Sequence, residues 1–361
     1  DVYTSADHNL TAQLDYVRLL HKLAQNNIQV FAVLGNHDPL EAWKAKIPFP
    51  PNVHIFPTES VERVPLVVDG EEVAAIYGQS YAKSEQRENL AWKFNRAAGD
   101  RFSIGMLHTQ VGSRESTYAP CTLEDLKECG MDYWALGHIH KHEILCEKPY
   151  IVYAGNPQGL DCTETGPRGC YYVEVGPYGT TDLEFIDTSI VRWESIDLAI
   201  DGIESVSELR ESVRFAKEKV RRNIGKPTFL TVNFTGSGSM YHVLNNPEAT
   251  QYWLDSWREE EQGKYAFVMV ERLRNLARPK MNLGERSKLP DSVGDYLNVF
   301  DKLEKLAPEE KVKALRDILM SRPEFERLGT YGRALTDERL LETFEKAKWL
   351  GVQKLLEHRR G

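Results

Sequence analysis

Short apolar runs and helical stretches alternate through the first half of the chain. Residues 10–25 have apolar side chains at the spacing of a helix. Runs rich in Val, Ile, Tyr and Phe follow, separated by Pro, Gly, Asn and Asp. They predict strands at 30–34, 73–77, 103–107, 133–136, 151–154 and 170–175. This alternation predicts an α/β layered domain over residues 1–190.

Beyond residue 190 the pattern changes to that of a smaller α+β domain. It predicts helices at 206–220 and 247–260 and strands at 229–234 and 267–270. We therefore expect a second domain over residues 191–271.

Residues 272–290 are rich in basic side chains, and the segment after them is helical in pattern. Six cations and one acid, Glu285, lie between 272 and 288, which favours a basic linker over 272–290. Pro308 suits the first turn of a helix, and residues 336–338 are typical of another helix start. We expect a helical region over 291–361.

Composition narrows the class of protein. The 361 residues are 41% hydrophobic and 27% charged, which is typical of a soluble, folded protein of two or three domains. No apolar run approaches the ~20 residues that cross a bilayer. The five cysteines have no C-x-x-C spacing, which argues against a disulfide framework or a thiolate zinc site and favours the cytoplasm.

The net charge of −9 means that any contact with nucleic acid must come from local basic patches. The sequence opens at Asp1 without an initiator methionine, so we expect that the natural protein has further residues before it.

Three predicted strands end directly in residues that can bind a divalent metal. The run 31–34 leads into Gly-Asn-His-Asp at 35–38, the run 104–107 into His108, and the run 133–136 into Gly-His-Ile-His at 137–140. Each pattern alone is more often an ordinary turn or strand end. Because the carboxyl ends of parallel strands share one edge of a sheet, the three together predict a single site.

The residue types at these strand ends suit a particular chemistry. Imidazole, amide and carboxylate donors favour Mn²⁺, Fe²⁺ or Zn²⁺. Two such ions ~3.5–4 Å apart can activate a water molecule and polarise a phosphoryl oxygen.

The three motifs resemble the last three motifs of the calcineurin-like metallophosphoesterases. The run Tyr-Trp-Ala-Leu-Gly-His at 133–138 and the second domain resemble the DNA-repair exonuclease branch of that family, the SbcD and YhaO type. The resemblance implies a sandwich of two mixed sheets flanked by helices, with a small α+β capping domain and a helical C-terminal tail. It also implies a two-metal, Mn²⁺-dependent DNA nuclease that acts in double-strand-break repair.

The resemblance also assigns metal ligands. Asp1 is similar to the family's metal-bridging aspartate. Asn36, His108 and His138 would complete the second metal, and His140 would hold the first. The family's opening D-x-H motif, which supplies two further ligands of the first metal, is absent from the sequence.

Two further residues receive catalytic roles from the resemblance. His37 is expected to donate a proton or to stabilise the transition state, and Asp38 to orient it. Thr4 stands where some relatives have a histidine, which puts a substrate-positioning role there in doubt.

The tail and the basic residues suggest partners. Lys219, Arg221 and Arg222, with the basic linker, are candidates for DNA-backbone contacts. An apolar stripe runs along the last helix at Leu341, Phe344, Ala347, Val352 and Leu355. It either packs on the protein's own domains or, as the resemblance implies, docks onto an SbcC-like or YhaN-like ABC-type coiled-coil ATPase.

Other readings remain open at this point. A homodimer is compatible with the resemblance. The phosphoesterase core could instead act on a phosphoester other than DNA, because its ligands contact only phosphate. The chain could also be a non-catalytic subunit that organises an ATPase, although the intact motif residues argue against that.

Overall fold

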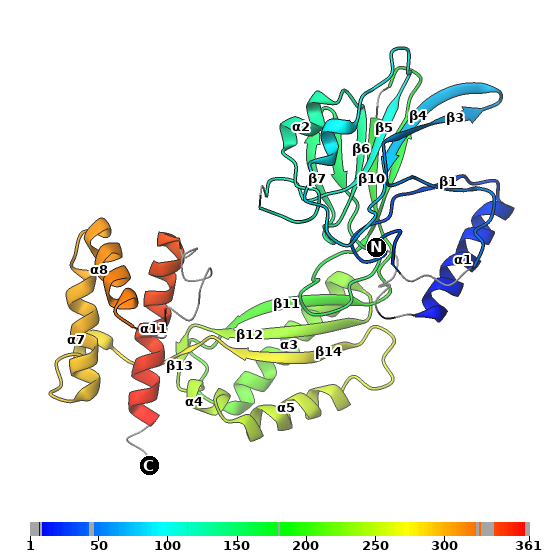
Figure 1. The fold of residues 1–361 in the computed structure, drawn as a ribbon. Helices are drawn as coiled ribbons and strands as arrows, with labels where there is room; N and C mark the ends of the chain where they lie inside the picture. The colour runs from blue at the N-terminus through cyan, green and yellow to red at the C-terminus, as the bar shows by residue number, and fades with distance from the viewer. Residues whose placement is uncertain are drawn as a thin grey trace. The chain divides into compact units, whose positions relative to one another are not determined.

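The computed structural model describes residues 7, 9–42, 47–113, 115–179, 181–322, 325 and 336–357. The chain, drawn in Figure 1, divides into two compact units. The first unit comprises residues 1–195, 220–231 and 261–271, and the second comprises 196–219, 232–260 and 272–361. Among the described helices, none has the length and apolar character needed to cross a membrane.

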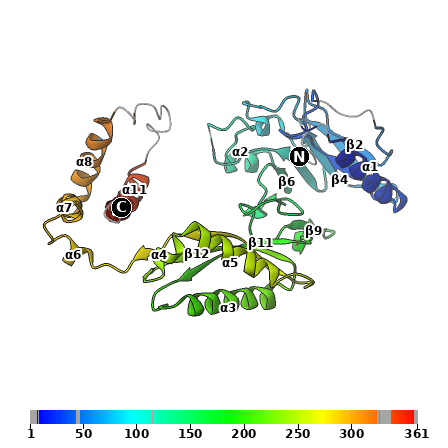
Figure 2. The same cartoon turned by 90° about the horizontal axis from the view of Figure 1, so that it is seen from below.

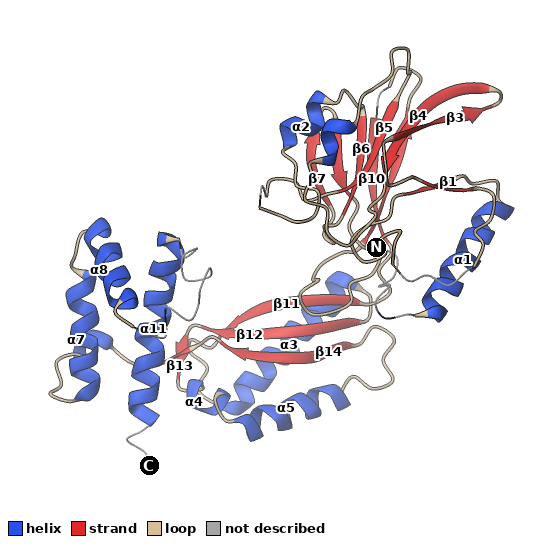
Figure 3. Cartoon of the chain, in the orientation of Figure 1, coloured by secondary structure: helices blue, strands red, loops and turns tan. Residues whose placement is uncertain are grey.

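A six-stranded mixed sheet is the centre of the first unit (Figure 3), and its strand order is β3-β4-β5-β6-β8-β7. The four inner strands are parallel, and the two edge strands are antiparallel to their neighbours. The strands are β3 (Glu62–Val68), β4 (Glu71–Gln79), β5 (Ser103–His108), β6 (Tyr133–Gly137), β7 (Glu143–Glu147) and β8 (Tyr150–Tyr153). The parallel core that the sequence predicted is therefore confirmed.

Both faces of this sheet are covered by apolar side chains. On one face, Trp134 and Leu107 pack in a core with residues of the short helices η2 (Leu90–Lys93) and α2 (Leu123–Glu128). On the other face, side chains of the antiparallel hairpin β9 (Gly169–Val175) and β10 (Thr181–Asp187) pack against Tyr133 and Val152. The result is the layered α/β sandwich expected from the sequence.

The strand before the Gly35–Asp38 motif is shorter than predicted and lies outside the six-stranded sheet. β1 (Val30–Ala32) pairs in parallel with β2 (Val53–Ile55). The chain after β1 nevertheless joins the chain after β4, because Tyr81 N–H donates to Leu34 O at 2.9 Å and Leu34 N–H donates to Ser80 Oγ at 3.0 Å. These bonds bring the motif to the carboxyl edge of the sheet.

The first helix, α1, spans Leu10–Gln25, as the apolar spacing predicted. Asn9 begins it, because its side chain accepts a hydrogen bond from Ala12 N–H and satisfies an otherwise unpaired donor of the first turn.

The predicted α+β region forms a three-stranded sheet in the order β11-β12-β14, with two helices along it (Figure 2). Val232 and Phe234 of β12 are buried, as are Trp253 and Trp257 of α5. The bounds are β11 (Arg192–Ala199), α3 (Val206–Ile224), β12 (Thr228–Thr235), β13 (Ser237–Gly238), α4 (Tyr241–Leu244), α5 (Pro247–Glu259) and β14 (Val268–Asn275).

The predicted basic linker at 272–290 is wrong in its first part. β14 continues to Asn275, so Arg272 and Arg274 belong to a strand. The reason is that β14 keeps its alternation after its apolar positions end, with Val270 buried and the two arginines exposed. β15 (Arg278–Pro279) and α6 (Leu283–Arg286) also lie within the predicted linker.

The C-terminal helices α7 (Ser292–Glu304), α8 (Pro308–Met320) and α11 (Asp337–Glu357) pack on one another, and α8 and α11 begin where the sequence signals placed them. Phe344 lies in a core with Phe300 and Leu315, and Val352 lies in a second core with Leu297. Leu341, Ala347 and Leu355 pack at the edges of these cores. The apolar stripe is therefore internal, which is the first of the two alternatives that the sequence left open.

Candidate metal centre

The loop after β1 presents three polar side chains in different environments. Asp38 is buried, Asn36 is partly buried and His37 is exposed. Asp38 was predicted to orient His37. That role stays a prediction, whereas the structure shows Oδ1 of Asp38 accepting the backbone N–H of Gly35 at 2.9 Å. This bond closes the turn that carries Asn36 and His37.

Asn36, His108 and His138 come together at the carboxyl edge of the sheet. His108 Nε2 lies 2.7 Å from Asn36 Oδ1, and His138 Nδ1 lies 3.4 Å from the same oxygen. The two imidazole rings have centroids 5.2 Å apart. Residues separated by up to 102 positions in the chain thus direct two ring nitrogens and one amide oxygen toward a common point.

His108 is held as a neutral imidazole. Its side chain is buried, and burial lowers its pKa to about 2, with the charge of His138 contributing in the same direction. The Tyr81 ring packs against it in a T-shaped arrangement, with centroids 5.2 Å apart. Neutral imidazole is the form that binds metal ions, so this environment suits a ligand.

His138 has an unusual backbone, with φ of 105°. A non-glycine residue rarely adopts such a value unless the surrounding structure holds it, and such residues concentrate at functional sites. The preceding Gly137 has little room, because a Cβ there would lie 3.0 Å from His108 Nδ1. Burial lowers the pKa of His138, and the charges of His140 and His37 add to the effect.

His140 is about half exposed and pairs with a carboxylate that the sequence did not indicate. Its Nδ1 lies 2.5 Å from Glu164 Oε1, and Asn156 Nδ2 donates to Glu164 Oε2 at 2.9 Å. Burial alone would raise the pKa of Glu164, but hydrogen bonds from Leu160 N–H, His140 and Asn156 lower it below its usual range. No local pattern marks Glu164, because it lies on a polar loop 24 residues from its partner.

Asp1 and Thr4 lie outside the described residues. Among the residues that are described, no three His, Cys, Asp or Glu side chains lie close enough to hold a metal by themselves. The converging set is instead two histidines and the amide of Asn36.

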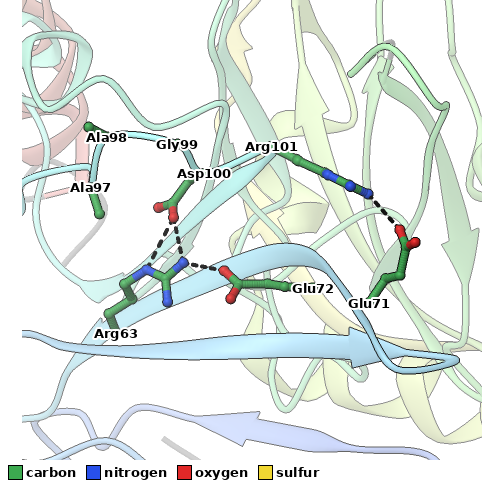
Figure 4. A pocket seen from close by; sticks show the side chains of 8 residues that line it. All are labelled: Arg63, Glu71, Glu72, Ala97, Ala98, Gly99, Asp100 and Arg101. Carbon is green, nitrogen blue, oxygen red and sulfur yellow. Dashed lines mark hydrogen bonds and ion pairs between the residues drawn. The ribbon is translucent and has the colours of Figure 1, made fainter.

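A separate cavity of about 660 Å³, shown in Figure 4, lies where β4 and β5 begin. His108 is at the other end of β5. Its charged side chains pair with one another: Arg63 with Asp100 and Glu72, and Arg101 with Glu71. Asp100 also accepts the hydroxyl hydrogen of Tyr77 at 2.5 Å. Because these charges are already paired, we interpret the cluster as structural.

Known protein families match two parts of this chain. The family model described as calcineurin-like phosphoesterase matches residues 5–142, which include all three motifs, and the model described as the middle domain of metallophosphoesterase YhaO matches residues 193–278. The uncharacterized metallophosphoesterase YhaO of Bacillus subtilis is 33% identical over 287 residues, which cover 78% of this chain and 70% of the relative. The chain belongs to the calcineurin-like metallophosphoesterases.

A more distant relative is named for a process, the repair of DNA double-strand breaks. The DNA double-strand break repair protein Mre11 of Methanocaldococcus jannaschii is 27% identical over 224 residues, covering 57% of this chain and 56% of the relative.

Calcineurin-like metallophosphoesterases use divalent metal ions, and the residues of this metallophosphoesterase fit that requirement. Its converging atoms are imidazole nitrogens and an amide oxygen, which suit first-row divalent ions. The neutral state of buried His108 leaves a nitrogen lone pair for the bond. Asn36, His108 and His138 would hold one ion, and His140 follows two residues after His138 on the loop after β6.

Proposed function

We propose that this metallophosphoesterase is a DNA nuclease of double-strand-break repair that hydrolyses phosphodiester bonds with two divalent ions, Mn²⁺ in particular. The observation that carries the proposal is the convergence of Asn36 and His108 with His138 at one sheet edge. The likeness to a protein named for double-strand break repair supports DNA as the substrate.

The residues would divide the work. Bound at this edge, divalent ions lower the pKa of a coordinated water and offset charge on the phosphoryl group. His140, with Asp1, would hold the first ion, while Asn36 and its two histidines hold the second. His37 is exposed on the same loop as Asn36, and we assign it the proton that the leaving sugar oxygen takes up.

DNA contacts would come from exposed basic side chains. Lys219 and Arg222 are exposed on α3 and remain candidates for backbone contacts. Arg221 is a poorer candidate, because it pairs with Glu261 and donates from Nε to Ala266 O at 3.0 Å. Phosphate contacts of this kind would position DNA without reading its sequence.

We also propose an SbcC-like or YhaN-like ATPase as partner, docked on the C-terminal helices. The docking residues would be outward-facing ones, because the apolar stripe of α11 is internal. Deleting residues after 290 should abolish co-purification with such an ATPase and spare Mn²⁺-dependent cleavage of small phosphodiesters.

The test is an assay of full-length protein with end-labelled double-stranded and single-stranded DNA, with and without Mn²⁺. We expect shortened products only with Mn²⁺, and none from the His138→Ala variant. A parallel arm uses bis(p-nitrophenyl) phosphate and phosphoserine peptide. If the protein hydrolyses these small substrates but does not cleave DNA, the nuclease proposal is rejected and phosphoesterase activity stands.

A further inference from the structure

The two histidines of the 137–140 motif engage neighbouring side chains through different ring nitrogens. His138 has its Nε2 2.9 Å from Gln110 Oε1, with its Nδ1 on the side of Asn36. His140 has its Nδ1 2.5 Å from Glu164 Oε1. Both nitrogens of His138 face amide oxygens, but the contact at Nε2 is shorter than the 3.4 Å from Nδ1 to Asn36 Oδ1. The carboxylate partner of His140 lies at Nδ1 instead.

These partners determine which nitrogen carries hydrogen. A carboxylate only accepts hydrogen bonds, so its partner nitrogen must carry the hydrogen, and the lone pair of a neutral ring then lies on the other nitrogen. The amide oxygen of Gln110 acts on His138 in the same way. We propose that Glu164 and Gln110 are positioning residues that hold the two histidines in opposite tautomers. His138 then binds a metal through Nδ1, and His140 binds through Nε2.

Glu164 is itself held in place. Its side chain is 13% exposed, and its Oε2 accepts the backbone N–H of Leu160 at 2.8 Å and Nδ2 of Asn156 at 2.9 Å. With Oε2 fixed by two donors, Oε1 is directed at the imidazole. An oriented carboxylate of this kind fixes both the tautomer and the ring plane of a metal-binding histidine.

The same loop also fixes the backbone of His140. Its carbonyl oxygen accepts hydrogen bonds from Asn156 N–H at 3.0 Å and from the buried guanidinium of Arg168. Gly155 allows this approach, because a Cβ there would lie 2.7 Å from the same oxygen. The segment 155–168 therefore holds both the main chain and the ring of His140, which a surface loop without a task would not require.

The proposal rests on the metal centre of the proposed function but not on DNA as substrate, so its test uses Mn²⁺ and a small phosphodiester without DNA. Calorimetric titration of full-length protein with Mn²⁺ should show one site weakened about 10- to 100-fold in Glu164→Ala. Thr163→Ala changes the neighbouring exposed side chain and should titrate like the parent. Hydrolysis of bis(p-nitrophenyl) phosphate by Glu164→Ala should recover at high Mn²⁺ with unchanged KM. A merely structural role would lower stability without recovery.

Nuclear magnetic resonance of the metal-free parent protein with ¹⁵N-labelled histidine reports the tautomers directly. His140 should carry hydrogen on Nδ1 and His138 on Nε2, with the peaks assigned from His140→Gln and His138→Gln. The opposite tautomer at His140, or unchanged Mn²⁺ affinity in a folded Glu164→Ala, would overturn the proposal. If Glu164→Ala does not fold, Glu164→Gln replaces it and should show a smaller loss. Loss of Mn²⁺ affinity in a protein that leaves DNA intact would reject the nuclease proposal alone.

Discussion

At the scale of single residues, the site brings together side chains in distinct environments. Oδ1 of Asn36 lies 2.7 Å from Nε2 of His108. His37, the next residue after Asn36, is exposed. Neighbours in sequence therefore occupy different environments, one facing a ligand position and one facing solvent. Substitution of His37 and of His138 should therefore separate proton transfer from metal binding.

His37→Ala should lower kcat about 10²- to 10⁴-fold and leave Mn²⁺ occupancy unchanged, because we assign it to proton transfer. His138→Ala should lose both activity and one Mn²⁺ ion. The two variants are compared by steady-state kinetics on a small phosphodiester and by metal analysis after gel filtration. If His37→Ala loses its metal, the two roles have been assigned wrongly.

At the scale of elements, the loop at 155–168 and the charged cluster at the other end of the sheet give separable predictions. Gly155 and Gly166 both have positive φ, but only Gly155 faces backbone at 2.7 Å, whereas a Cβ at Gly166 meets nothing within 4 Å. Both alanine variants should have a free energy of unfolding about 1–2 kcal/mol lower, because alanine is strained in a left-handed backbone conformation. Gly155→Ala should lose more and should also bind Mn²⁺ more weakly. Denaturant unfolding with Mn²⁺ titration checks this, and equal effects of the two variants would contradict it.

Asp100 is the buried member of the charged cluster, with a side chain 2% exposed against 32% for Arg63. Asp100→Asn should destabilise the protein by about 2–4 kcal/mol, because it leaves Arg63 without its buried partner. Glu71→Gln, at an ion pair exposed on both sides, should cost less than about 1 kcal/mol. Urea unfolding measures the loss of stability in each variant. Equal losses in Asp100→Asn and Glu71→Gln would contradict a buried ion pair at Asp100.

The cluster also predicts a pH dependence. Burial opposes ionisation of Asp100, but hydrogen bonds from Arg63, Tyr77 and Ser103 hold its pKa below the usual value. A carboxyl group with a lowered pKa in the folded state stabilises the fold above its unfolded pKa of ~3.9, and this contribution is lost as pH falls further. The stability difference between parent and Asp100→Asn should therefore shrink on acidification below about pH 4.

Much of this arrangement was predictable from local sequence. The apolar runs of β5 and β6 and the histidine motifs that follow them indicated a shared strand edge, because buried parallel strands are continuous apolar segments. Gln110 and Glu164 were not predictable, because a polar loop residue acquires its task only from a partner brought close by the fold. The predicted strand at 267–270 ended too early, because the rest of β14 carries exposed arginines and not apolar side chains.

At the scale of the whole molecule, each compact unit has its own core, so stability and catalysis should be separable. Phe344→Ala should destabilise the C-terminal helices by about 3–5 kcal/mol, because Phe344 is buried against Phe300 and Leu315. Leu350→Ala on the same helix, 54% exposed, should have little effect. Both variants should keep Mn²⁺-dependent hydrolysis of a small phosphodiester. Calorimetric unfolding and the assay together check this, and loss of hydrolysis in a folded Phe344→Ala protein would contradict it.

The central claim is that Asn36, His108 and His138 hold a divalent ion at the carboxyl edge of the sheet. The most direct measurement is an anomalous difference map from crystals of the full-length protein grown with Mn²⁺. We predict a peak within bonding distance of Asn36 Oδ1, a ring nitrogen of His108 and Nδ1 of His138, and its absence in His138→Ala crystals. Mn²⁺ peaks that avoid these three atoms, in crystals where other sites are occupied, would contradict the account.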